Sequence, residues 1–169
     1  MFKSDKRIIG KGAEITMKIA VGADHGGFEL KGHLMDFLKG LGHSVTDFGA
    51  RDNSPSDYPE FGYKVAHAVS REGYDRGVLI CKTGIGISIV ANKLTNVRAG
   101  VCQDLKSARL SREHNDLNVL VMGSEFVSLP KAKEVLKVWL ETDFSTEERH
   151  RRRVKQISEI EKKVLGEKA

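Results

Sequence analysis

Residues 77–86 read Gly77-Val78-Leu79-Ile80-Cys81-Lys82-Thr83-Gly84-Ile85-Gly86. The first five form a continuous apolar run, which is typical of a strand buried on both faces of a parallel sheet. A turn containing two glycines follows, and a helix is predicted directly after it over Ile87–Lys93. This stretch therefore predicts a strand, a tight turn and a helix, which is the repeating unit of a parallel α/β fold.

The same alternation continues on both sides of this unit. Further strands are predicted over Lys18–Gly22, Ser44–Phe48, Ala99–Cys102 and Val119–Met122. Further helices are predicted over Phe28–Leu41, Glu60–Arg71, Leu105–Glu113 and Leu129–Leu140, whereas Gly49–Pro59 is rich in turn-forming residues and is predicted as a loop. Five strands separated by helices predict an α/β three-layer sandwich around a five-stranded parallel sheet with right-handed crossovers.

The chain has 169 residues, which suits one domain, expected over residues 17–169. Residues 1–16 are polar and lack convincing periodicity, so they are predicted to be a poorly ordered N-terminal extension. An extra C-terminal helix is expected at about residues 146–165, where Val154, Ile157 and Ile160 lie on one apolar stripe. A helix left over after a complete sheet often packs on a second subunit.

Composition excludes several classes of function. The net charge is +5, but the excess lies in the two ends of the chain, and residues 17–146 carry 16 basic and 16 acidic side chains. This neutral body argues against nucleic-acid binding. No apolar run reaches the ~18 residues needed to cross a bilayer, and no secretory signal opens the chain, so a cytoplasmic location without membrane contact is expected. The two cysteines are too few for a disulfide framework.

Several candidate functional residues follow the carboxyl ends of the predicted strands, where parallel sheets bind their ligands. Asp24 and His25 follow the first strand, and they suit either an acid/base pair or a helix cap in a surface turn. Tyr58 follows the second strand. Cys81, beside its glycine-rich turn, suits either a nucleophile or base at an anion-binding turn, or a buried core cysteine. No nucleotide-binding glycine motif is present.

Two further pairs lie on predicted helices. His114 and Asn115 close the helix before the last strand, a position that favours these residue types for helix termination alone. Arg149 and Arg153 are four residues apart on the C-terminal helix, a spacing that suits either a phosphate grip or a solvated basic face.

Taken together, the sequence resembles the ribose-5-phosphate isomerase B family, which includes galactose-6-phosphate isomerase subunits and allose-6-phosphate isomerases. Five ordered segments carry the resemblance: Val21–Gly27, Asp57–Pro59, Cys81–Asn92, Ser111–Asp116 and Arg149-His150. The resemblance implies a Rossmann-like fold that forms a homodimer or homotetramer with active sites at the subunit interface. It implies the interconversion of D-ribose 5-phosphate and D-ribulose 5-phosphate, in the non-oxidative branch of the pentose phosphate pathway, without a metal or other cofactor.

The resemblance also assigns catalytic roles. Cys81 would be the base that moves a proton between C1 and C2 of the open-chain sugar, with Thr83 assisting it. His114 would open the furanose ring, and Asp24 would act on the other ring-opening hydroxyl. The backbone of one turn would stabilise the enediolate, at Gly84, Ile85, Gly86 and Ser88.

The remaining roles concern binding of the substrate. His25, Arg149 and Arg153 would hold the phosphate, Asn115 would align the sugar, and Tyr58 would line the pocket. Within the family, the presence of both Cys81 and His114 favours the ribose enzyme, because galactose-6-phosphate isomerase subunits often lack an equivalent of this histidine.

This chain departs from the family pattern at three places. Lys82 stands where the family usually has glycine, and a positive φ there would be strained. Glu125 stands where many members have an arginine that reaches the phosphate, and Glu147-Glu148 replaces the usual Gly-Gly, so a weaker phosphate grip is expected. One hypothesis is that the Lys82 ammonium replaces the missing arginine charge.

Two alternatives to a ribose-5-phosphate isomerase stay open. One is an isomerase of a six-carbon sugar phosphate, and the other is a non-catalytic protein that senses a sugar phosphate by binding it without turnover.

Overall fold

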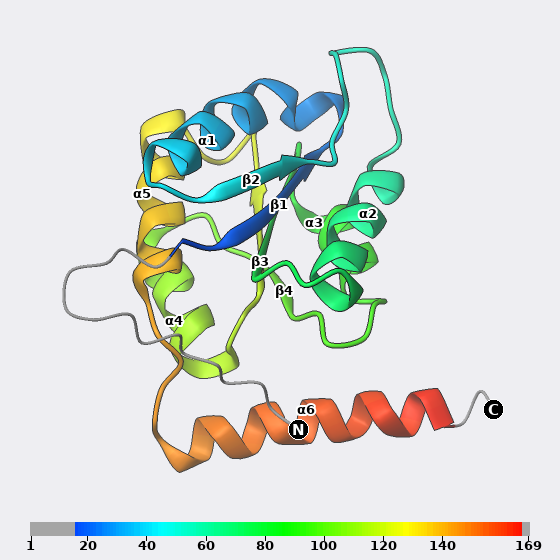
Figure 1. The fold of residues 1–169 in the computed structure, drawn as a ribbon, viewed down its shortest axis with the longest axis vertical. Helices are drawn as coiled ribbons and strands as arrows, with labels where there is room; N and C mark the ends of the chain where they lie inside the picture. Colours follow the sequence, from blue (N-terminus) through cyan, green and yellow to red (C-terminus); the bar gives the residue numbers. More distant parts are fainter. Residues whose placement is uncertain (1–15, 167–169) are drawn as a thin grey trace.

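The computed structural model describes residues 16–166, so nearly all of the predicted N-terminal extension lies outside the described residues. Five strands form one sheet in the order β2-β1-β3-β5-β4, and all neighbouring pairs are parallel (Figure 1). The strands are β1 Lys18–Ala23, β2 Ser44–Asp47, β3 Arg76–Cys81, β4 Ala99–Val101 and β5 Val119–Gly123. The predicted α/β fold with a five-stranded parallel sheet is confirmed.

Helices cover both faces of this sheet. They are η1 His25–Gly27, α1 Phe28–Gly40, α2 Tyr58–Arg71, α3 Ile85–Ala91, α4 Leu105–Asn115, α5 Leu129–Glu141 and α6 Glu148–Gly166. Side chains of α1, α4 and α5 pack with one face of the sheet, around the fully buried Trp139. Side chains of α2 and α3 pack with the other face, around Val65 and Ile87. The two apolar faces of the strands explain why their sequences are continuous apolar runs.

Several predicted boundaries differ from the observed ones by one or two residues. Tyr58 and Pro59 were expected in the loop but form the first turn of α2, where the fixed φ of proline suits a helix start. Helix α3 begins at Ile85, directly after Gly84 in the left-handed conformation. The C-terminal helix expected at about residues 146–165 is α6, Glu148–Gly166, and the Glu147 carbonyl accepts the N–H of Arg151 at 3.3 Å as its first helical bond.

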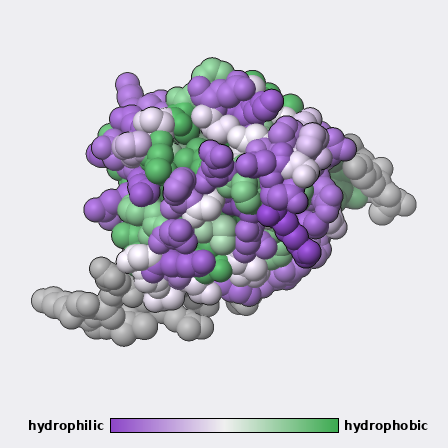
Figure 2. All heavy atoms as spheres, turned by 90° about the horizontal axis from the view of Figure 1, so that it is seen from above, coloured by the Kyte–Doolittle hydropathy of each residue, from purple (hydrophilic) through white to green (hydrophobic). Residues whose placement is uncertain are grey.

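The apolar stripe of α6 is mostly uncovered. Val154 is buried against the domain, but Ile157 and Ile160 are 43% and 63% exposed. An open groove of about 580 Å³ runs between the second half of α6 and the segments around Leu94 and Leu117. The rest of the surface is mostly hydrophilic on the side that Figure 2 presents, with small separate hydrophobic patches. Within residues 16–166, no helix is both long and apolar enough to span a membrane.

Candidate active site

The Cys81 thiol lies at the carboxyl end of β3, with its side chain 5% exposed. The N–H of Gly84 donates a hydrogen bond to its Sγ at 3.1 Å. Gly84 has φ +80, and a Cβ there would lie 3.2 Å from the Met122 carbonyl carbon. Only glycine fits this turn without strain, because an L side chain is disfavoured at that φ. The glycine therefore places an amide donor on the sulfur.

The turn after Cys81 presents several donors at one place. The Ile85 N–H donates to the Thr83 hydroxyl at 3.2 Å, and the Ser88 hydroxyl donates to the Ile85 carbonyl at 2.7 Å. The next two amides, of Gly86 and Ile87, make no backbone hydrogen bond within the described residues. Two unpaired N–H groups beside a thiol suit the stabilisation of an oxyanion.

Asp24 follows β1 and caps the short helix η1. Its Oδ1 accepts the N–H groups of Gly26 at 3.0 Å and Gly27 at 3.2 Å. The side chain is 5% exposed. The capping interpretation is thus correct, and within residues 16–166 no hydrogen bond involves Oδ2, which leaves that oxygen for a substrate hydroxyl.

His25 is held by the loop that joins β2 to α2. The Ser56 N–H lies 3.1 Å from its Nδ1, and the Ser56 hydroxyl accepts the His25 N–H at 3.1 Å. Nδ1 also lies 3.2 Å from the Ser56 carbonyl, so it faces both a backbone donor and a backbone acceptor. Both contacts use Nδ1, which leaves Nε2 for a ligand; when it carries a proton, Nε2 can donate to an anion. Sequence reasoning missed Ser56, because nothing distinguishes it from the other serines of that loop.

The side chains of Tyr58 and Lys82 pack against the backbone of Gly86 and Gly26, respectively. A Cβ at Gly86 would lie 2.5 Å from the Tyr58 ring carbon Cζ, so the ring rests on the Gly86 backbone. A Cβ at Gly26 would lie 2.6 Å from Lys82 Cγ, so the lysine stem crosses beside η1. Lys82 itself does not have a positive φ, and the strain considered for this departure is absent.

His114, on the last turn of α4, stacks on His150 of α6. Their ring centroids are 4.2 Å apart, with 33° between the planes. His150 is 3% exposed, and its buried Nδ1 has no hydrogen-bond partner within the described residues. Burial lowers the pKa of His150, and the neighbouring His114 and Arg149 lower it further. These surroundings therefore favour the neutral form of the His150 ring, which lies beside the half-buried His114.

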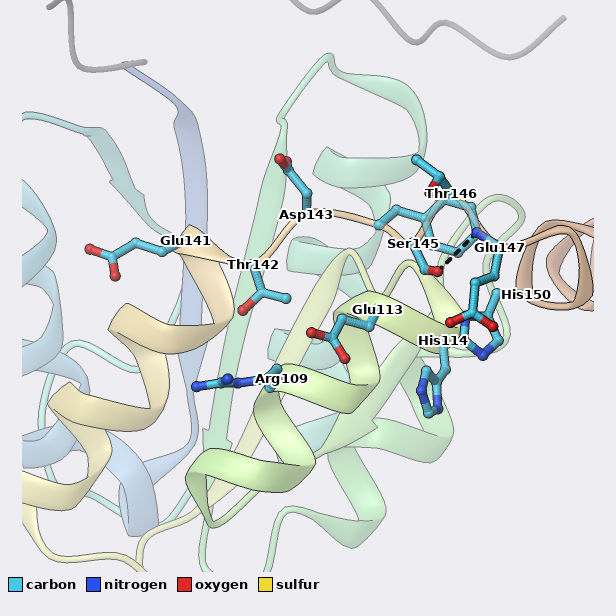
Figure 3. Close-up of a pocket in the computed structure, with 11 residues that line it drawn as sticks. Arg109, Glu113, His114, Glu141, Thr142, Asp143, Ser145, Thr146, Glu147 and His150 are labelled. Atoms are coloured by element: carbon cyan, nitrogen blue, oxygen red, sulfur yellow. Dashed lines mark hydrogen bonds between the residues drawn. The ribbon is translucent and has the colours of Figure 1, made fainter.

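An open pocket of about 600 Å³ contains these two histidines, and Figure 3 shows their rings side by side beneath Glu147. Arg149 is exposed and pairs with Glu147, with 2.7 Å between Nε and Oε2. Arg153 is also exposed, one helical turn further along α6. Glu147, which stands where the family usually has glycine, thus pairs its carboxylate with Arg149, one of the two arginines expected to bind the phosphate.

The structure brings the predicted residues together as two groups rather than one. The thiol group, Asp24, His25, Tyr58 and residues 81–88, lies at the carboxyl edge of the sheet. His114 and Asn115 instead precede β5, whose first residue Val119 pairs with Gly77 and whose last residue Gly123 pairs with Cys81. The length of β5 separates the two edges by about 13 Å, at roughly 3.3 Å per residue. Arg149 and Arg153 belong to the histidine group, because α6 packs against α4.

A metal site was sought among the same residues. Within residues 16–166, no three His, Cys, Asp or Glu side chains are grouped so that they could hold a metal ion.

Comparison with known proteins gives a consistent relationship. The family model described as ribose/galactose isomerase matches residues 19–157. Ribose-5-phosphate isomerase B of Escherichia coli is 45% identical over 146 residues, covering 86% of this chain and 97% of that protein. The D-erythrulose-4-phosphate isomerase of Pectobacterium atrosepticum is 37% identical, covering 76% of this chain and 85% of that protein.

A solved structure is similar throughout the fold. Ribose-5-phosphate isomerase B of Clostridium thermocellum is 51% identical and superposes with a TM-score of 0.85, covering 88% of this chain and 99% of that one.

Proposed function

Since this chain belongs to the ribose/galactose isomerase family, we propose that it interconverts D-ribose 5-phosphate and D-ribulose 5-phosphate. The observation that carries the proposal is the Cys81 thiol, buried at a strand end beside two unpaired amide donors. A base next to an oxyanion site is what an aldose–ketose isomerisation requires.

The proton transfer begins on the open-chain aldose. The Cys81 thiolate removes the proton from C2, and the C2–H electrons form a C1–C2 double bond while O1 takes the negative charge. The Gly86 and Ile87 amides donate to this enediolate oxygen. The O2 proton then passes to O1, with the Thr83 hydroxyl beside the thiol as relay. Cys81 returns its proton to C1 as the C2–O2 double bond forms, which leaves the neutral hydroxyl on C1 and the ketone of ribulose 5-phosphate. A positioned base supplies this step without a metal.

Ring opening and phosphate binding use the other candidates. His114 and the free Oδ2 of Asp24 exchange protons with the ring oxygen and the anomeric hydroxyl of the furanose. The His25 Nε2 donates to the phosphate, to which Arg149 and Arg153 add charge. Asn115 aligns the sugar and Tyr58 lines its pocket.

A second copy of the chain is needed to join the two groups. Within one chain they lie at opposite edges of the sheet, so the histidine group of one protomer would face the thiol group of its partner. Exposed apolar side chains flank both groups, namely Ile85 and Ile89 beside the thiol group and Ile157 and Ile160 on α6. Such surfaces suit burial in a homodimer. We place this enzyme in the cytoplasm and in the pentose phosphate pathway.

Lys82 adds a charge at the phosphate end of the pocket. Its stem lies beside Gly26, next to His25, and within residues 16–166 its ammonium forms no ion pair. A Lys82→Ala protein is expected to raise the KM for ribose 5-phosphate about tenfold with little change in kcat, because one charge-assisted contact is lost. Lys39→Ala removes the same charge from the far end of α1 and should change neither constant. An unchanged KM in Lys82→Ala would exclude the contact.

The test of the function is the rate at which the purified chain converts ribose 5-phosphate without added metal. A kcat near the ~10 per second typical of enzymes is expected. Allose 6-phosphate and D-erythrulose 4-phosphate run in parallel decide between substrates, since one relative is named for the four-carbon ketose. Binding of all three sugars without turnover would overturn the proposal in favour of a sugar-phosphate sensor.

A further inference from the structure

The last turn of α4, which carries His114 and Asn115, ends in an unusual cap. The cap residue Asp116 has φ +47, the left-handed conformation that glycine or asparagine usually supplies at a helix end. Its backbone N–H donates to the Arg112 carbonyl at 3.1 Å. An aspartate at this position carries a backbone cost, and its carboxylate must offset that cost.

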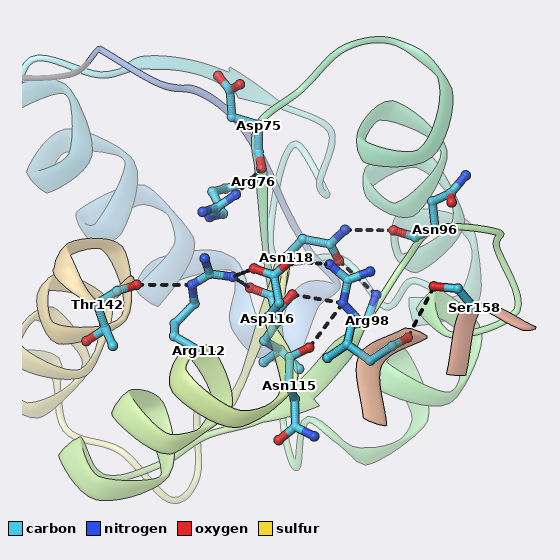
Figure 4. A network of polar contacts seen from close by, with 12 residues as sticks. Asp75, Arg76, Asn96, Arg98, Arg112, Asn115, Asp116, Asn118, Thr142 and Ser158 are labelled. Atoms are coloured by element: carbon cyan, nitrogen blue, oxygen red, sulfur yellow. Dashed lines mark hydrogen bonds and ion pairs between the residues drawn. The ribbon is translucent and has the colours of Figure 1, made fainter. Parts of the chain in front are cut away.

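Two arginines bind the two oxygens of that carboxylate. Arg98, directly before β4, reaches Oδ2 at 2.9 Å, and Arg112 of α4 reaches Oδ1 at 2.8 Å (Figure 4). Arg112 is 4% exposed and also donates to the Leu117 and Thr142 carbonyls. Burial lowers the pKa of Arg112, whereas Asp116 raises it, so the carboxylate compensates a charge held out of water.

Arg98 has a second function in the same network. Its Nε donates to the Asn115 carbonyl at 3.1 Å and to the Asp116 carbonyl at 2.9 Å. Its own backbone N–H donates to the Asn118 side chain at 2.8 Å. One guanidinium thus fixes the chain directly after His114 to the start of β4, a task that suits the rigid fork of arginine.

We infer that Arg98 is a positioning residue for His114: it holds the end of α4 so that the His114 ring stays on His150 and faces its pocket. The inference rests on the proposed ring-opening function of His114. The donors of Arg98 lie on the carbonyls of the two residues that directly follow His114, so loss of the guanidinium releases the turn that carries this imidazole. Within residues 16–166, no hydrogen bond or ion pair joins Arg98 to the thiol group, so the proton transfer at Cys81 should not depend on it.

The test separates the two chemical steps with two substrates. Ribose 5-phosphate closes to a furanose and must be opened, whereas D-erythrulose 4-phosphate carries its phosphate on O4 and cannot form a five-membered ring. In Arg98→Met, kcat/KM for ribose 5-phosphate is expected to fall at least about tenfold more than for the four-carbon sugar, because small misplacements of a catalytic group are costly. Arg98→Lys, which keeps the charge without the fork, should fall in between. Arg71→Met, an exposed arginine on α2, should match the parent.

Equal losses on both substrates, or no loss on either, would overturn the inference. If the parent protein isomerises no sugar, the proposed function fails first. The positioning claim is then decided by the imidazole NMR signals of the full chain: Arg98→Met should shift His114 and leave His25 unchanged. An unmoved His114 signal, or equal shifts of both rings, would exclude a specific role for Arg98.

Discussion

The Cys81 thiol differs from the other thiol of the chain in what surrounds it. Cys102 is also buried, and burial raises the pKa of its thiol. Gln103 and Asp104 follow it in place of a glycine-rich turn, and the Asp104 carboxylate caps α4 by accepting the Ser107 N–H at 2.8 Å. Cys102 therefore packs in the core, while Cys81 combines a thiol with an anion-stabilising turn.

This contrast gives a matched pair of variants. Cys81→Ala should lose about 10²–10⁴-fold in kcat, the usual contribution of a positioned base. Cys102→Ala should keep most of its activity and lose about 1 kcal/mol of stability through a small cavity. Kinetics with ribose 5-phosphate and thermal unfolding measure the two effects. Full activity of Cys81→Ala would remove the thiol from the mechanism.

His150 should make stability depend on pH. Burial and its neighbours lower its pKa in the folded chain, so the unfolded chain binds a proton more readily. Its contribution to stability is therefore complete above the ordinary value of 6.5 and is lost as the pH falls below it. The Tm should drop less between about pH 7.5 and pH 5 in His150→Phe than in the parent. His33 is an exposed residue of α1, so His33→Gln should retain the parent dependence of Tm on pH. The same dependence in His150→Phe would contradict the assignment.

At the scale of elements, a buried lysine fixes the loop that holds His25. Lys31 of α1 is 2% exposed, and its Nζ donates to Asp47 Oδ2 at 2.6 Å and to the Ala50 carbonyl at 2.8 Å. These contacts anchor the start of the segment that ends at Ser56. The helix thereby sets the position of a loop that belongs to the site.

Lys31→Met should cost about 1–3 kcal/mol, because it leaves the buried Ala50 carbonyl without a donor. It should also weaken substrate binding through the loop, raising KM more than it lowers kcat. Lys64→Met removes an exposed pair with Glu60 and should cost under about 0.5 kcal/mol. Denaturant unfolding measures the free energy of unfolding of both variants. Equal losses in the two would show that the contacts of Lys31 do not anchor the loop.

The elements were predictable where one physical rule decided them. Apolar runs such as Gly77–Cys81 predicted the buried strands, and their alternation with helices predicted the parallel sheet. Position at strand ends also predicted the group of Asp24, His25 and Cys81. Ser56 and the stem of Lys82 were not predictable, because their contacts depend on how a loop and a turn pack in space. Tyr58 was placed in the loop, since turn-rich composition hid the helix start at proline.

At the scale of the whole molecule, the two groups of site residues predict shared active sites. In a dimer that pairs Cys81→Ala with His114→Ala, one site contains both defects and the other contains an intact thiol and an intact histidine. Refolding the two inactive variants together at equal amounts should therefore restore about a quarter of the parent activity, given random pairing about a two-fold axis. Each variant refolded alone is the control. A mixture that stays inactive would contradict a site built from two chains.

The distance between the two edges of the sheet also has a genetic consequence. On the proposed dimer, each site draws one half from each of two gene products. After a gene duplication, one copy can lose its thiol group and the other its histidine group, while a mixed pair still keeps one complete site. Because β5 separates the two groups, two diverged chains can come to need each other for activity without the evolution of a new site in either chain.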